Sequence, residues 1–383
     1  MNNLVVLQRE YGQSIWIDFI SRDALVSGEL ANWVDRGVLG LTSNPAIFAK
    51  AILTGKTYDQ DIARLLAQGK TAPQIYEALA LEDITTAADL LRPVYDRTDG
   101  LDGYVSLEVS PHLAHDTAGT VSEARRLFAA LDRPNVMIKV PGTPEGIPAI
   151  AALIGSGINI NVTLLFAISA YEAAANAYLD GLEAWARAGG DVHKVASVAS
   201  FFVSRLDAVI DSALKGQPDE PALRGRAGVA NTKLAYARFL QVFSGPRWER
   251  LAARGARVQR PLWASTSTKN PAYPDTMYVD DLIGPHTVNT VPPQTLVAFL
   301  DHGKMAPTLT EGVADARALM APLARPGFAS RAGGVPACGV ARLAAAGIDL
   351  GQVTDGLLAA GVKAFADAFD ELISTLHRKV HCV

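Results

Sequence analysis

Eight short apolar runs, separated by longer stretches of helical composition, constrain the fold of this chain more than any other feature of its sequence. Each run is rich in β-branched and aromatic residues with little polar alternation, which is typical of strands buried on both faces of a parallel sheet. The runs are 15–19, 39–43, 104–109, 136–140, 158–166, 195–198, 260–265 and 286–290. Eight such runs favour an α/β fold of the (β/α)₈ TIM-barrel type over an open doubly wound sheet.

The spacing between the runs predicts where the barrel carries additions. A bare barrel of this kind takes about 250 residues, whereas this chain has 383. The stretches 50–103 and 206–259 are long enough for two or more helices each, so we expect helical insertions there. We expect a single domain over 1–383, with the barrel core at about 10–305 and a C-terminal helical extension at about 306–383.

The C-terminal extension has two parts. Residues 320–340 are rich in Ala, Gly, Pro and Arg and indicate a loop. An amphipathic helix follows, because apolar residues recur at helical spacing and acidic residues lie off that stripe. The apolar positions are Val362, Phe365, Phe369, Leu372 and Leu376. We expect this helix to pack against the barrel rather than to bind a partner.

Composition excludes several classes of protein. Lys and Arg number 35 and Asp and Glu 39, a net charge of −4, so no nucleic-acid or anionic-membrane surface is expected. Hydrophobic residues make up 49% and charged residues 19%, which excludes disorder, allows a large core and permits a homo-oligomer. Two cysteines, Cys338 and Cys382, cannot form a disulfide framework or a Cys-rich zinc site, which favours a reducing, cytoplasmic location.

One uncharged stretch, from Gly146 to Tyr171, is long enough to span a bilayer. It is interrupted by Pro148, Gly155 and several polar residues. A helix that ends near Gly155, followed by a buried strand, therefore explains it better than a membrane span.

Polar side chains interrupt or directly follow several of the apolar runs. They are Asp18, Asn44, Glu108, Lys139, Thr163 and Ser200. The carboxyl ends of the strands of such a barrel meet at one mouth, where the active site lies. We therefore expect these six side chains to converge.

Lys139 lies inside the apolar run VMIKV. A buried amine is unfavourable unless it reaches a cavity or a partner, and a side chain that bends toward water at the strand end is the simple alternative. The functional interpretation is a Schiff-base nucleophile, because a lysine in water is protonated and burial favours the neutral, attacking amine. Lys194 and Lys269 are the rival lysines, but Lys194 precedes its strand and so belongs to the opposite face.

Asp18 and Glu108 each interrupt an apolar strand. Two carboxylates at one mouth can divide proton-transfer work. For one carboxylate alone a pairing with a nearby cation is the better explanation, but two of them together with a buried lysine favour catalysis. Metal ligation would call for histidine beside them, and the seven histidines show no ligand spacing such as H-E-x-x-H. We therefore expect no metal.

A second group of residues suits a phosphate. The segment SFFVSR at 200–205 closes the sixth run and opens a helix, and backbone N–H groups at a helix start bind anions together with an arginine such as Arg205. Lys269, after the seventh run, adds a second cation. An ion pair of Arg205 with Asp207 or another local carboxylate is the alternative without a ligand.

Taken together, these segments resemble the transaldolase family, and the likeness runs in order over essentially the whole chain. The matching pieces are TSNP at 42–45, SLEV at 106–109, IK at 138–139, NVTLLF at 161–166, SFFVSR at 200–205, PLWAS at 261–265 and TVNT at 287–290. The length and the C-terminal region resemble the longer bacterial branch of that family.

The resemblance implies a class I aldolase-type barrel that works without metal or organic cofactor. It implies a transferase of the non-oxidative pentose phosphate pathway. Sedoheptulose 7-phosphate or fructose 6-phosphate would donate a three-carbon dihydroxyacetone unit, and glyceraldehyde 3-phosphate or erythrose 4-phosphate would accept it. These sugar phosphates are the expected partners.

The resemblance also implies roles for individual residues. Lys139 would form the Schiff base, Asp18 would move the proton of the C4 hydroxyl, and Glu108 would act through a water held by Thr163. The residues expected to bind the dihydroxyacetone hydroxyls are Asn44, Asn161 and Ser200. The residues expected to bind the phosphate are Arg205 and Lys269, with Ser265.

Two departures from the family pattern stand out. Many relatives have Arg where Lys269 aligns, which changes a bidentate phosphate contact into a point charge. Many have Pro after the serine matched by Ser200, whereas this chain has Phe201.

Two rival functions stay open at this point. A plain aldolase would use the same Schiff base and release free dihydroxyacetone. A non-catalytic sugar-phosphate-binding barrel would bind the same ligands without covalent chemistry.

Overall fold

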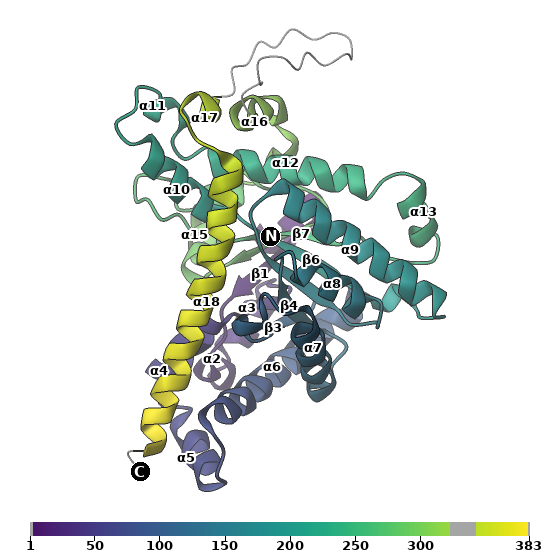
Figure 1. Ribbon diagram of the computed structural model, residues 1–383, viewed down its shortest axis with the longest axis vertical. Helices are drawn as coiled ribbons and strands as arrows, with labels where there is room; N and C mark the ends of the chain where they lie inside the picture. Colours follow the sequence, from purple (N-terminus) through teal and green to yellow (C-terminus); the bar gives the residue numbers. More distant parts are fainter. Residues whose placement is uncertain (1–2, 322–341, 382–383) are drawn as a thin grey trace.

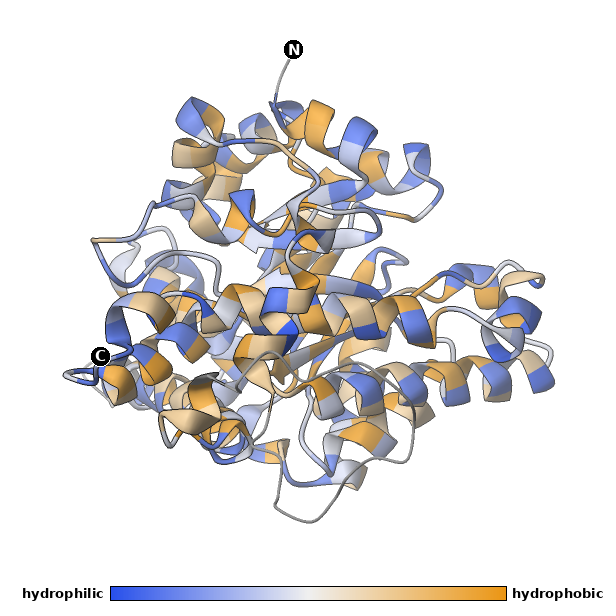
Figure 2. Cartoon of the chain, turned by 90° about the horizontal axis from the view of Figure 1, so that it is seen from above, coloured by the Kyte–Doolittle hydropathy of each residue, from blue (hydrophilic) through white to orange (hydrophobic). Residues whose placement is uncertain are grey.

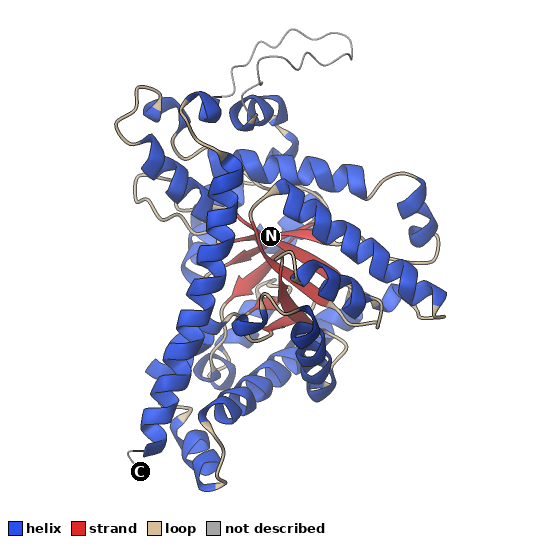
Figure 3. Ribbon diagram, viewed as in Figure 1, coloured by secondary structure: helices blue, strands red, loops and turns tan. Residues whose placement is uncertain are grey.

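The computed structural model describes residues 3–321 and 342–381, and at its centre eight parallel strands form a closed barrel surrounded by helices (Figure 1, Figure 3). Each strand pairs with the next, and β1 pairs with β8 to close the ring. The strands are β1 Gln13–Asp18, β2 Leu41–Thr42, β3 Val105–Glu108, β4 Val136–Pro141, β5 Ile160–Leu165, β6 Ser197–Phe202, β7 Arg260–Ala264 and β8 Thr287–Val291. The predicted (β/α)₈ fold is thus confirmed.

The helices cover the outside of the barrel, and Figure 2 shows orange and blue bands alternating along them, as amphipathic helices require. The helices of the first half are α1 Asn3–Tyr11, α2 Arg22–Val26, α3 Glu29–Asp35, α4 Pro45–Thr54, α5 Asp59–Ala67, α6 Ala72–Arg97, α7 Thr117–Leu131, α8 Gly146–Ile154 and α9 Ile168–Arg187. Those of the second half are α10 Ser204–Leu214, α11 Glu220–Leu223, α12 Ala227–Val242, α13 Pro246–Ala252, α14 Met277–Asp280, α15 Pro293–His302, α16 Val313–Met320, α17 Arg342–Ala345 and α18 Leu350–His381. Short 3₁₀ turns are η1 Pro111–Leu113, η2 Val192–Lys194 and η3 Thr308–Thr310.

The expected helical insertions are present: α5 and α6 lie within 50–103, and α11, α12 and α13 lie within 206–259. The loop expected at 320–340 falls almost wholly on residues outside the described part of the chain. The uncharged stretch from Gly146 divides into α8 and β5. Among the described residues, no helix has the length and apolar character needed to cross a membrane.

The sixth strand differs from the expectation in a way that matters for the site. We expected it at 195–198 with Ser200 after its end, but β6 runs over Ser197–Phe202. It pairs with β7 from Val198 to Phe202, and Phe201 is fully buried beside Trp263. Ser200 is therefore an internal residue of the strand. Strand β8 begins one residue later than expected, because His286 has a φ of 60°.

The amino-terminal end of the barrel is closed by a buried ion pair between Arg260 and Asp102. The Asp102 carboxylate lies 2.9 Å from Arg260 Nη1 and accepts hydrogen bonds from Ser14 Oγ at 2.7 Å and Trp16 Nε1 at 2.9 Å. Arg260 also donates to the carbonyl oxygen of Thr287 at 2.8 Å. This network links the starts of β1, β7 and β8 opposite the mouth, on the face that stabilises such barrels.

Removing Asp102 tests how much this ion pair contributes to the stability of the barrel. Asp102→Ala leaves the Arg260 guanidinium buried without a counter-charge, and we expect it to lower the free energy of unfolding by about 3–5 kcal/mol. Urea denaturation followed by circular dichroism measures this loss. The matched control is Asp96→Ala, which breaks an exposed pair with Arg92 and should leave the unfolding curve nearly unchanged. Equal, small effects in both variants would contradict this role for the network.

Candidate active site

Lys139 lies within β4 with its side chain inside the barrel, and it is only 4% exposed. Its register neighbours are Glu108 on β3 and Asn161 on β5, so these three side chains stand side by side. Lys139 Nζ donates a hydrogen bond to the carbonyl oxygen of Ser43 at 3.0 Å and lies 3.4 Å from Glu108 Oε2. The amine is thus turned into the barrel rather than toward water at the strand end, which rules out the simple alternative.

Glu108 is the acidic neighbour of Lys139 and is itself only 6% exposed. Neither of its carboxylate oxygens accepts a hydrogen bond from the described residues. The 3.4 Å contact with the amine is therefore the main interaction that offsets the cost of burying this carboxyl group. Burial raises the pKa of Glu108, and the charge of Lys139 opposes that rise. A carboxyl group whose pKa is raised holds its proton more readily than an exposed one, which suits a group that must both take and give a proton.

Asp18 closes β1 at the mouth. Its Oδ1 accepts a hydrogen bond from Thr42 Oγ1 at 2.6 Å, and that hydroxyl lies 2.7 Å from Thr290 Oγ1. Burial raises the pKa of Asp18, and the charge of Lys139 opposes this. Asp18 thus lines the same cavity as Lys139, and burial raises the pKa of both carboxyl groups near that amine.

A chain of polar side chains crosses the barrel beside Lys139. Asn161 Nδ2 donates to Ser106 Oγ at 3.0 Å, and Ser200 Oγ donates to Asn161 Oδ1 at 2.7 Å. These bonds fix the orientation of the Asn161 amide. Thr163, on the same strand as Asn161, is fully buried, and its hydroxyl has no hydrogen-bond partner among the described residues.

Asn44 follows β2 and begins α4. Its Oδ1 accepts a hydrogen bond from the backbone N–H of Ile47 at 3.0 Å, and Pro45 occupies the first turn, so Asn44 is the N-cap of α4. The cap holds the side chain at the mouth, where it lines the same cavity as Lys139.

Two cations lie at the rim of the mouth. Arg205 comes from the first turn of α10 and stacks over the ring of Phe202, and Lys269 Nζ donates to Ser267 Oγ at 2.7 Å. Burial lowers the pKa of both groups, and the charge of Arg205 lowers that of Lys269 further. Two cations so close together favour a bound anion.

The alternative for Arg205, an ion pair with Asp207, is not observed. Asp207 instead accepts hydrogen bonds from the backbone of Gly228 and from Tyr278 Oη, both at 2.8 Å. Ser265 has a φ of 56°, and its hydroxyl lies 2.9 Å from Ser204 Oγ at the start of α10. The turn after β7 is thereby held against the helix that carries Arg205.

A cavity of about 250 Å³ connects these groups. Eight of the ten predicted site residues line it: Asp18, Asn44, Lys139, Thr163, Ser200, Arg205, Ser265 and Lys269. Asn161 lies behind it and contacts Ser200. Glu108 adjoins it through Lys139 and lines a neighbouring cavity of about 240 Å³.

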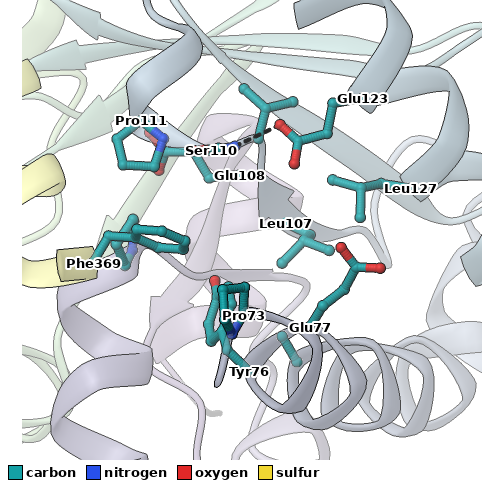
Figure 4. A pocket seen from close by; sticks show the side chains of 13 residues that line it. Pro73, Tyr76, Glu77, Leu107, Glu108, Ser110, Pro111, Glu123, Leu127 and Phe369 are labelled. Carbon is teal, nitrogen blue, oxygen red and sulfur yellow. Dashed lines mark hydrogen bonds between the residues drawn. The ribbon is translucent and has the colours of Figure 1, made fainter. Parts of the chain in front are cut away.

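That neighbouring cavity lies outside the strands, between α6, α7 and α18 (Figure 4). Its walls are largely apolar, and they include Tyr76 of α6 and Phe369 of α18, whose rings meet edge to face at 5.3 Å. Glu123, on its far side, accepts a hydrogen bond from the backbone of Ser110. Glu108 is thus placed between an apolar cavity and the polar one that holds Lys139.

Sequence reasoning missed several residues that line the main cavity: Thr42, Phe202, Thr266, Ser267, Thr290, Gln294 and Phe365. Thr42 lies in the segment 42–45 and Phe202 in the segment 200–205, both of which lie at the end of a predicted strand. Their position next to a strand end could therefore have identified them as residues of the mouth. Gln294 and Phe365 come from α15 and α18, beyond the last strand, where no strand-end rule applies. In the described part of the chain, no three His, Cys, Asp or Glu side chains gather as metal ligands would.

Comparisons with known proteins agree with this geometry. The family model described as transaldolase/fructose-6-phosphate aldolase matches residues 15–376. The chain is 46% identical over 373 residues to a protein named transaldolase from Parafrankia sp., covering 96% of each chain. It is 45% identical over 392 residues to transaldolase 2 from Nostoc sp., covering 99% of this chain and 98% of the relative. It is 49% identical over 332 residues to transaldolase 1 from Streptomyces avermitilis, covering 86% and 88%. The buried lysine, its two carboxyl neighbours and this extended likeness together place the chain in the transaldolase/fructose-6-phosphate aldolase family.

Proposed function

We propose that this enzyme is a transaldolase, which moves a dihydroxyacetone unit between sugar phosphates through a Schiff base on Lys139. Sedoheptulose 7-phosphate or fructose 6-phosphate donates the unit, and glyceraldehyde 3-phosphate or erythrose 4-phosphate accepts it. The observation that carries the proposal is a lysine amine buried in the barrel, 3.4 Å from Glu108 and in one cavity with Asp18 and two cations. Amine, acid–base groups and anion site are what such a reaction requires.

The first steps make the imine. The neutral amine of Lys139 attacks the C2 ketone of the donor to give a carbinolamine, and loss of water leaves an iminium cation. Glu108 moves the protons of these steps through a water held by the free hydroxyl of Thr163. The raised pKa of Glu108 suits it to give a proton in one step and take it back in another.

Cleavage follows, with the iminium as electron sink. Asp18 takes the proton of the C4 hydroxyl, the C3–C4 bond breaks, and its electrons reach the iminium nitrogen, which leaves a neutral enamine and a free aldehyde. The second half reverses these steps on the acceptor, and Asp18 returns the proton to the new C4 oxygen. Because the iminium supplies the electron sink, these steps need no cofactor.

Positioning comes from the polar residues around the amine. Asn44, Asn161 and Ser200 bind the hydroxyls of the dihydroxyacetone unit and retain the enamine until an aldehyde arrives. Arg205 and Lys269, with Ser265, bind the phosphate at the rim. The separation of a neutral hydroxyl site from a cationic rim orients the sugar with its phosphate outward. We place the reaction in the cytoplasm, which suits a chain with two cysteines.

Transfer must be distinguished from the release that a plain aldolase would catalyse and from binding alone. We expect sedoheptulose 7-phosphate and glyceraldehyde 3-phosphate to give fructose 6-phosphate and erythrose 4-phosphate in equal amounts, with little free dihydroxyacetone. Chromatography of the products measures all three. Accumulation of dihydroxyacetone at the rate of donor loss would show a plain aldolase, and no turnover would favour a binding protein.

The cationic rim predicts a selective loss of phosphate recognition. Arg205→Ala removes charged hydrogen bonds to the phosphate, and we expect KM for glyceraldehyde 3-phosphate to rise roughly 10- to 100-fold. The same variant should use the unphosphorylated acceptor glyceraldehyde about as well as the unaltered enzyme. The control is Lys194→Ala, an exposed lysine at the opposite end of the barrel. A parallel loss with both acceptors would count against a phosphate site at Arg205.

A further inference from the structure

We propose that Phe365, in the middle of α18, is a positioning residue for the Schiff-base nitrogen of Lys139 and limits release of dihydroxyacetone relative to its transfer. The inference rests on the proposed function and extends it to the C-terminal helix. Phe365 lines the same cavity as Lys139, and Lys139 Nζ lies 5.7 Å from the centre of its ring. The ring is 4% exposed.

The helix that carries Phe365 is fixed against the mouth at several points. It packs on α4 and α6, on η1 and α10, and on β5 itself. Gly361 lies against β5 so closely that an added Cβ would come within 2.8 Å of Leu164 Cδ2. Leu372 and Leu376 are fully buried, and Phe369 packs against Tyr76 in the neighbouring cavity (Figure 4). Phe365 is therefore held in place rather than free to swing away.

The position of the ring suits the charge that the reaction creates. An aromatic face attracts a cation within about 6 Å of its centre, and the iminium carries its positive charge on the nitrogen that is now Lys139 Nζ. The ring favours the iminium over neutral forms and holds the nitrogen near Glu108. A side chain without hydrogen-bonding groups also occupies space that water would otherwise fill.

Exclusion of water by Phe365 affects whether the enamine releases dihydroxyacetone or transfers it. Release requires a proton to add at C3 of the enamine and water to add at C2 of the resulting iminium, after which the C2–N bond breaks and frees dihydroxyacetone and the Lys139 amine. Transfer instead requires the acceptor aldehyde to add at C3, and its product iminium is then released by the same addition of water at C2. The two paths therefore separate at the enamine, where either a proton or the aldehyde reaches C3. A ring that keeps water out of this part of the cavity limits the delivery of a proton to C3 and so slows release more than transfer.

The test compares two phenylalanines of the same helix. Phe365→Leu keeps an apolar side chain but removes the aromatic face next to Lys139, whereas Phe369→Leu removes a ring one turn away that faces Tyr76. For each enzyme, the ratio of free dihydroxyacetone to transferred product is measured with fructose 6-phosphate and erythrose 4-phosphate. We expect a rise of roughly 3- to 30-fold for Phe365→Leu and no change for Phe369→Leu. Phe365→Met, which fills the space differently, serves the same purpose if the leucine variant does not fold.

Each result of this series either supports or contradicts the inferred role of Phe365. An unchanged ratio in Phe365→Leu or Phe365→Met, or an equal rise in Phe369→Leu, would overturn the inference and leave the helix with a packing role only. Failure of the unaltered enzyme to transfer the unit at all would instead overturn the proposed function, which this series therefore distinguishes from failure of the inference.

Discussion

A single lysine amine inside an apolar barrel is the constraint on which the rest of the site depends. A buried amine must be compensated, and at Lys139 the compensation comes from the Glu108 carboxylate and the Ser43 carbonyl. Glu108 and Lys139 are register partners on the paired strands β3 and β4, so the pairing of the strands places the carboxylate next to the amine. The groups that make the burial tolerable are thus the same groups that the proposed chemistry uses.

The amino-terminal end of the barrel holds a buried ion pair that stabilises the strands, and the opposite end, the mouth, holds the candidate active site. At the amino-terminal end, the charges of Arg260 and Asp102 are paired with each other inside the barrel. At the mouth, polar atoms are left with partial satisfaction, as with the carboxylate of Glu108 and the hydroxyl of Thr163. The two unsatisfied groups at the mouth line cavities, so they remain available for a substrate or a water. Helix α18 completes the mouth with an apolar side chain next to the amine.

The barrel and most of the site could be predicted because their signals are local. Lys139, Glu108 and Asp18 are charged exceptions within apolar strands, and parallel strands bring such exceptions to one mouth. The limits of β6 were not predicted: it pairs with β7 from Val198 to Phe202, and such pairing between distant segments is not visible in the local sequence. Phe365 was expected only as part of a packing face, since the sequence of a helix shows which face is apolar but not which residue of that face reaches the active site.

Reductive trapping at a defined residue tests the central claim that Lys139 is the nucleophile. The protein is incubated with fructose 6-phosphate and sodium borohydride, digested, and its peptides are analysed by mass spectrometry. We expect a reduced dihydroxyacetone adduct on Lys139 and none on Lys269, the other lysine that lines the cavity. An adduct on Lys269, or no substrate-dependent adduct on any lysine, would contradict the account.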